Sequence, residues 1–185
     1  DLFVPPAARI PFRPPTIQIP LKVTPMQLPI TGNDLRKTLL GAELTELECN
    51  ILAQVCTVRH VPSGDVLFRE GESHHELYVI LDGRLAVNKD SGRGFADTLH
   101  ILSPGDLAGE SGFLDGKPHS ATLRAVGDAT VLALHRENLE RLVKDHPFMV
   151  YHVMRAIIRS IRGIMVRMNS QCSQMTQYIQ SGSRF

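Results

Sequence analysis

Between residues 56 and 134 the sequence alternates between short apolar runs and turn-forming residues, and this alternation constrains the fold most. Runs such as VLF, LYVIL and ATVLAL are separated by groups such as SGD, DG and PGD. Short, regularly spaced strands with tight turns are typical of antiparallel barrels. We therefore predict about eight strands in an eight-stranded jelly-roll, or double-stranded β-helix, barrel. Asp82-Gly83, between two of the runs, predicts a hairpin.

Two short helices are expected before the strands. Asp34 is a plausible N-cap for a helix over residues 35–40. Thr45 is followed by Glu48 at the spacing of a capping box, which predicts a second helical start. Residues 34–145 would thus combine these helices with the barrel.

The segment 146–185 predicts one long helix and a tail. From Phe148 to Ile179 there is no proline, and apolar residues follow alternating spacings of four and three, the heptad pattern of a coiled coil. Such a helix is too long for a small barrel to cover, so we expect a homodimer, although the first turns could pack on the barrel of their own chain. The predicted seam consists of Val150, Met154, Ile157, Ile161, Ile164 and Met168.

Residues 1–33 predict an extended, proline-rich arm. Eight of the twelve prolines precede residue 30, and proline disfavours both helix and central strand. Large apolar residues between the prolines favour an arm that packs on its own domain or on a neighbouring subunit over a solvated linker.

Composition excludes several classes of protein. The net charge of +1 argues against a strongly basic nucleic-acid binder, and three cysteines without a CxxC pair argue against a disulfide framework or zinc ribbon. No apolar run spans a membrane and no secretory signal is visible, so we expect a cytoplasmic protein. No catalytic set of side chains is recognisable, so we expect no enzyme. A solvated loop explains His74-His75 better than a metal site does.

The stretch Gly105–Thr122, GDLAGESGFLDGKPHSAT, contains the residues best suited to bind a ligand. Gly109 and Gly112 would let the backbone come close to a ligand, and the amides after Gly109 would form an anion site at a helix start. The carboxylate of Glu110 can accept a hydrogen bond from a sugar hydroxyl, and Ser120 can donate one to a phosphate oxygen.

These residues resemble the phosphate-binding cassette of cyclic nucleotide-binding domains, as in catabolite-activator-type regulators and kinase regulatory subunits. FREGE at 68–72 and LYVILDGRL at 77–85 are similar to the glycine-marked strands before that cassette. The resemblance covers about residues 44–168 and implies a non-enzymatic, ligand-sensing regulatory domain for cyclic AMP, cyclic GMP or a related phosphate ligand, signalling through the C-terminal helix. The ligand-binding residues it implies are Gly109, Glu110, Ser111, Gly112, His119, Ser120 and Ala121.

His119 departs from the family, which has an arginine at this position. Arginine offers a permanent charge and a bidentate fork, whereas histidine is charged only when protonated. Three outcomes are open: His119 binds the phosphate weakly and better at low pH, Lys117 or Arg124 replaces the arginine, or the site has another ligand or none. Residues 160–165 on the long helix are largely apolar, so the sequence does not indicate whether the base of a bound nucleotide would be adenine or guanine.

The long helix is basic, with no acidic residue after Asp145. A solvated coiled-coil face explains Arg155, Arg159, Arg162 and Arg167 better than an acidic partner does. No helix-turn-helix, and so no DNA-binding motif, fits after this helix in the chain. The alternatives are a degenerate domain that serves as a dimerisation or scaffold module, within a larger assembly or alone, and the sensor half of a transcription regulator.

Overall fold

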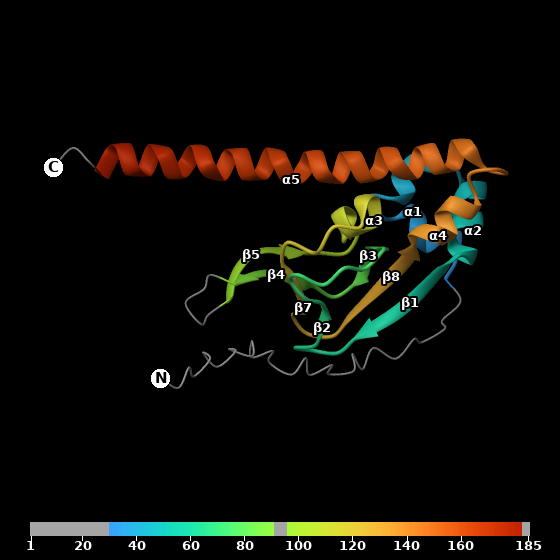
Figure 1. Ribbon diagram of the computed structural model, residues 1–185, viewed down its shortest axis with the longest axis horizontal. Coiled ribbons are helices and arrows are strands. Elements are labelled where there is room, and N and C mark those ends of the chain that lie inside the picture. Colours follow the sequence, from blue (N-terminus) through green and yellow to red (C-terminus); the bar gives the residue numbers. More distant parts are fainter. Residues whose placement is uncertain (1–29, 91–95, 183–185) are drawn as a thin grey trace, which may run out of the picture.

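Two antiparallel sheets of four strands each form the barrel in residues 30–90 and 96–182, which the computed structural model describes (Figure 1). The predicted eight-stranded jelly roll is confirmed. One sheet contains, in spatial order, β1 (Cys56–Val61), β8 (Ala129–His135), β3 (Glu76–Asp82) and β6 (Leu107–Ala108). The other contains β2 (Val66–Phe68), β7 (Thr122–Ala125), β4 (Leu85–Asp90) and β5 (Ala96–Leu102).

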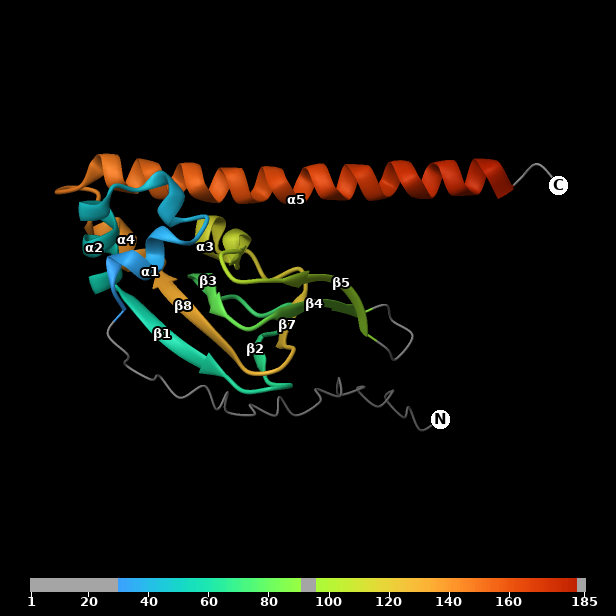
Figure 2. The same ribbon diagram turned by 180° about the vertical axis from the view of Figure 1, so that it is seen from behind.

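Most of the helices gather at one end of the barrel. The last helix begins there, runs along the barrel and extends beyond its opposite end (Figures 1 and 2). Within the described residues, the order along the chain is α1 (Gly32–Arg36), the 3₁₀-helix η1 (Gly41–Glu43), α2 (Glu46–Gln54), α3 (Glu110–Asp115), α4 (Arg136–Arg141) and α5 (Pro147–Gly182). The 36 residues of α5 span about 54 Å. No helix in this described part is long and apolar enough to cross a membrane.

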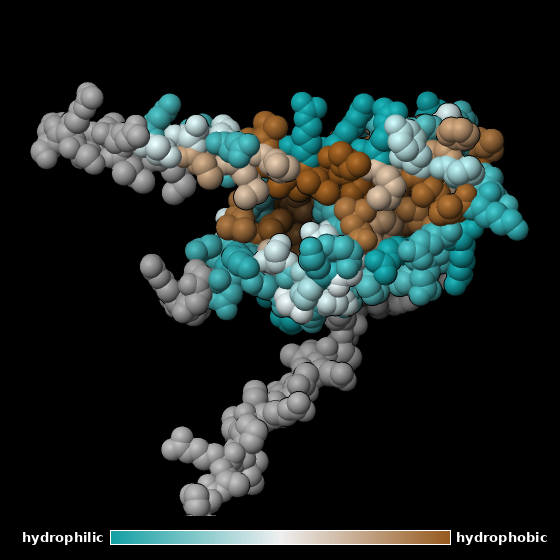
Figure 3. Space-filling model, turned by 45° about the horizontal axis from the view of Figure 1, so that its top comes forward, coloured by the Kyte–Doolittle hydropathy of each residue, from teal (hydrophilic) through white to brown (hydrophobic). Residues whose placement is uncertain are grey.

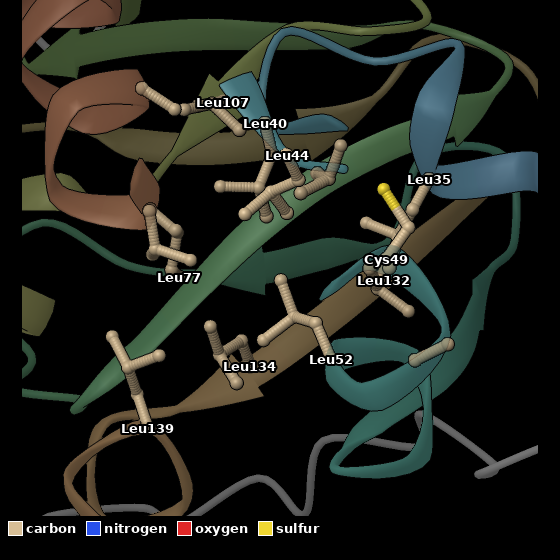
Figure 4. Close-up of a cluster of buried hydrophobic side chains, with 14 of the residues drawn as sticks. Leu35, Leu40, Leu44, Cys49, Leu52, Leu77, Leu107, Leu132, Leu134 and Leu139 are labelled. Atoms are coloured by element: carbon tan, nitrogen blue, oxygen red, sulfur yellow. The ribbon is translucent and has the colours of Figure 1, made fainter. Parts of the chain in front are cut away.

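The central strands β3 and β8 are buried on both faces. Tyr78 and Ile80 point into the barrel, whereas Leu77 and Val79 belong to a second cluster that the helices cover. Successive side chains of a strand point to opposite faces, so a strand covered on both sides needs an uninterrupted apolar run, as in LYVIL. Figure 4 shows the second cluster, in which leucines of α1, α2, β3 and β8 meet.

The first turns of α5 complete this second cluster. Met149, Val153, Ala156 and Ile157 are buried in it. Ile157 is 0% exposed inside its own domain, so its predicted place in a dimer seam is wrong. The heptad pattern could not reveal this, because the same apolar spacing serves intramolecular packing equally well.

The Asp82-Gly83 turn does not form the predicted hairpin, because β3 and β4 lie in different sheets. Both edges of β3 are already paired, with β6 and β8, so no edge is free for β4. The turn instead carries the chain from one sheet to the other. Gly83 has a φ of +77°, and a β-carbon on it would lie 2.3 Å from the carbonyl oxygen of Asp128.

The first helix also begins earlier than predicted. Thr31 is the N-cap, and Asp34 is the third helical residue, whose carboxylate accepts hydrogen bonds from the backbone N–H and Oγ1 of Thr31 at 3.2 and 2.8 Å. Those bonds lower the pKa of Asp34. The capping box at Thr45 is confirmed. Of the predicted arm, residues 1–29 lie outside the described residues, and its last residues already belong to α1.

Replacing Gly83 with alanine should destabilise the fold more than the same change at Gly64. Both residues have left-handed backbone angles, but nothing lies within 4 Å of a β-carbon on Gly64. Gly64→Ala should therefore cost only the backbone strain of about 1–2 kcal/mol. Gly83→Ala adds the clash with residue 128 and should cost at least about 3 kcal/mol in the free energy of unfolding. Equal losses in urea denaturation would contradict this reading of the turn.

Candidate functional site

A pocket of about 560 Å³ lies between the barrel, the start of α3 and the long helix α5. Figure 3 shows hydrophobic side chains around a hollow between α5 and the barrel. The barrel contributes mainly apolar side chains, among them Phe68, Val87, Leu99, Leu102, Leu107 and Leu123. The helix contributes Ile161, Ile164, Met165, Arg167, Met168 and Gln171.

Six of the seven predicted binding residues line this pocket: Gly109, Glu110, Ser111, His119, Ser120 and Ala121. Gly112, the seventh, is buried and does not line the pocket. A β-carbon on Gly112 would lie 2.4 Å from the carbonyl oxygen of His74, and one on Gly109 would lie 2.7 Å from that of Glu76. Contacts within the protein therefore require both glycines, whatever ligand the pocket holds.

The carboxylate of Glu110 connects the pocket wall to the long helix. Its Oε1 accepts a hydrogen bond from Oγ of Ser160 at 3.0 Å. Glu110 is the first residue of α3, and Gly109, which precedes it, is the N-cap, with a φ of +84°. A ligand hydroxyl that binds Glu110 must therefore share this carboxylate with the Ser160 hydroxyl or displace that hydroxyl.

His119 is 4% exposed. Its ring stacks on Phe68 at a centroid distance of 3.8 Å, and its Nε2 has no hydrogen-bond partner among the described residues. Burial, reinforced by the nearby His74, lowers the pKa of His119, while Glu72 acts in the opposite direction. A buried polar atom without a partner is costly, and an acceptor on a ligand would satisfy it once the nitrogen carries a proton.

Residues 58–146 match the sequence model of the cyclic nucleotide-binding domain. This part of the chain belongs to the cyclic nucleotide-binding domain family. A cyclic AMP receptor protein of Thermus thermophilus is 32% identical over 104 residues, which cover 56% of this chain and 48% of that protein. The chain thus spans about half the length of the curated relatives it matches.

Solved structures agree with the fold of this cyclic nucleotide-binding domain. A cyclic nucleotide-binding domain from Methylobacillus flagellatus superposes with a TM-score of 0.71 at 20% identity, over 76% of this chain and 81% of that one. The Thermus thermophilus catabolite activator protein superposes with a TM-score of 0.62 at 27% identity, over 73% of this chain and 63% of that one. The resemblance inferred from the cassette is confirmed at the level of family and fold.

Neither cation suggested as a replacement for the cassette arginine lines the pocket of this domain. Nζ of Lys117 lies 2.9 Å from Oδ2 of Asp115, and the Lys117 side chain is largely in solvent. Arg124 donates a hydrogen bond to the carbonyl oxygen of Gly64, on the turn before β2. Their positions support neither substitution.

Sequence reasoning missed several residues of the pocket, above all Arg167, Gln171 and His100. The two helical ones continue the face that begins at Ser160, with spacings of four, three and four through Ile164, Arg167 and Gln171. That spacing was a usable pattern, but only the contact between Ser160 and Glu110 identifies it as the pocket face. His74, read from the sequence as a loop residue, lies 5.4 Å from His119, ring to ring.

Replacing His119 with phenylalanine should reduce the loss of stability in mild acid. Because the folded-state pKa lies below the ordinary value of 6.5, the unfolded chain takes up a proton below pH 6.5 that the folded chain does not, and the free energy of unfolding falls. His119→Phe removes this proton uptake and can keep the stack on Phe68. Urea denaturation between about pH 7 and about pH 5 avoids the titration of most carboxylates.

His100→Gln, which removes an exposed pocket histidine, is the control for this experiment. If His119→Phe lost as much stability in acid as the wild type, His119 would not be the residue that causes the acid-induced loss.

Proposed function

We propose that this chain is a non-enzymatic, ligand-sensing regulatory domain that binds a cyclic nucleotide, or a related phosphate ligand, and signals through α5. The observation that carries the proposal is that a single pocket brings together the cassette and the long helix. The hydrogen bond from Ser160 to Glu110 joins these two parts directly.

The side chains of the pocket suit the parts of a cyclic nucleotide. The Glu110 carboxylate would accept a hydrogen bond from the ribose 2′-hydroxyl. The phosphate would lie near the backbone amides of Ser111 and Gly112, the Ser120 hydroxyl and Nε2 of the His119 ring. Apolar walls of the barrel and α5 would cover the base. The volume of about 560 Å³ falls within the range of about 300–1,000 Å³ for small-molecule sites.

Signalling would be a population shift. A ligand moves a conformational equilibrium only if it binds the two states with different affinity. Here α5 forms one wall of the pocket, so states that differ in the position of this helix differ in ligand contacts. Replacement of the Ser160 hydroxyl by a ribose hydroxyl at the Glu110 carboxylate would couple ligand binding to the position of α5.

We also propose a homodimer through an exposed face of α5. Tyr151, Ile158 and Met165 are 57%, 61% and 58% exposed and follow one another at seven-residue intervals. Together with Met154, Ile161 and Met168 they form a row in which successive residues are alternately three and four positions apart. This seam shares three members with the one expected from the sequence and replaces the buried Ile157 with the exposed Ile158.

A reducing, cytoplasmic environment suits this domain. Its three cysteines are all free. Burial raises the pKa of Cys56 to about 12 and also raises that of Cys49, so both remain thiols.

Isothermal titration calorimetry with cyclic AMP and cyclic GMP should detect binding that strengthens as the pH falls from about 8 to about 6. The anionic phosphate favours the protonated form of His119, so binding takes up a proton when the free site is neutral. His74 and Glu72 act on the charge of this ring, and Glu110, His100 and Arg167 are the other titratable or charged residues that line the same pocket. No heat at millimolar ligand at either pH would contradict the sensor function and favour the scaffold alternative.

His119→Arg should bind the same nucleotide about tenfold to a hundredfold more tightly at pH 8, because a charged hydrogen bond contributes about 1.5–3 kcal/mol. The variant should also lose the dependence of affinity on pH, since arginine does not titrate. Lys117→Arg, which adds a guanidinium outside the pocket, is the control. Unchanged affinity and pH dependence in His119→Arg would show that the phosphate lies elsewhere.

Ile158→Glu should weaken the dimer, measured by sedimentation equilibrium, because it places a charge in the proposed seam. Val166→Glu is the matched control: Val166 is 59% exposed and lies on another face of α5. Removal of the whole helix is unsuitable, since it would also remove the buried Met149, Val153 and Ala156. If the two glutamate variants weakened the dimer equally, or if neither weakened it, the proposed dimer seam would be contradicted.

A further inference from the structure

The proposed phosphate site lacks a permanent positive charge within the cassette. Its carboxylate, Glu110, is negative, and burial opposes protonation of His119. Lys89 is near, but its Nζ is already bound to Glu70 and to the carbonyl oxygen of Ser120. A phosphate would therefore meet one negative and one neutral group unless a cation comes from another element.

The long helix carries four arginines in this region, and two of them hold it on the domain. Arg155 and Arg159 both pair with Glu43 of η1, whose side chain is only 7% exposed. Arg162 is exposed and does not line the pocket. These three arginines are therefore paired elsewhere or lie outside the pocket lining.

Arg167 alone among the arginines and lysines of the described residues lines the pocket. It has no ion pair or hydrogen bond to another residue of that described part. Its Nη1 lies 3.6 Å from the position of a β-carbon on Gly163, one turn earlier, where the absence of a side chain leaves space along the helix. The guanidinium is thus exposed, uncommitted and on a long stem that rotates readily.

We propose that Arg167 supplies the permanent positive charge for the phosphate of the ligand, in place of the arginine that the cassette lacks at residue 119. This inference rests on the proposed function. The guanidinium matches a phosphate with a fork of donors, which a single histidine nitrogen does not provide. Because Arg167 belongs to α5 and not to the barrel, phosphate binding would draw the signalling helix towards the pocket directly.

The test compares Arg167→Gln with Arg162→Gln by calorimetry with cyclic AMP and cyclic GMP. The two arginines lie on the same helix and lose the same charge, but only Arg167 lines the pocket. We expect Arg167→Gln to weaken binding about tenfold or more and Arg162→Gln to change it less than about twofold. Arg167→Lys, which keeps the charge but not the fork, should fall between Arg167→Gln and the wild type.

The dependence on salt separates a charge contact from a structural role. Raising the ionic strength from about 0.1 M to about 1 M shortens the Debye length from about 10 Å to about 3 Å. The affinity of the wild type should fall over this range, and that of Arg167→Gln should fall less. Equal salt dependence would overturn the assignment of a charge contact to Arg167.

Two outcomes distinguish this inference from the function on which it rests. If the wild-type chain binds and Arg167→Gln binds within about twofold of it, the inference is wrong and the proposed function stands. If the wild-type chain binds neither nucleotide, the proposed function fails, and the inference fails with it.

Discussion

Burial of β3 and β8 on both faces is the constraint on which the other parts of the structure depend. One face of these strands fills the barrel, where Tyr78 and Val131 lie in one cluster. The opposite face presents Leu77 and Leu134 to the helices. Because this second face must also be covered, the first turns of α5 are held on the barrel, and the helix then continues over the pocket. The position of the pocket wall follows from the packing of the core.

The helix α5 serves different contacts on different faces. Its early residues are buried in the core, later ones line the pocket, and a third set is exposed. Met165 and Met168 both line the pocket and are more than half exposed. A ligand and a second copy of the chain would therefore contact some of the same side chains. Since a methionine side chain adapts its shape easily, these two residues suit a surface that changes partners.

Much of the fold and most of the candidate site could be predicted locally. Alternating runs and turns predicted the strands, and the spacing from Gly109 to Ala121 predicted the cassette, because strand periodicity and turn chemistry depend on near neighbours. The two-residue strand β6 was missed, since Leu107–Ala108 is too short to show a period. The stack of His119 on Phe68 was also missed, because these residues lie far apart in the sequence and meet only when β2 and β7 pair.

The sequence by itself determined which segments form all the strands but the shortest, where the long helix lies and which loop resembles a phosphate-binding cassette. Only the tertiary structure decided that Asp82-Gly83 joins two sheets, that Ile157 belongs to the core and that Arg167 lines the same pocket as the cassette. The physical reason is the same in each case. Local periodicity specifies that an element has an apolar or a charged face, whereas the packing of distant segments decides which surface that face meets.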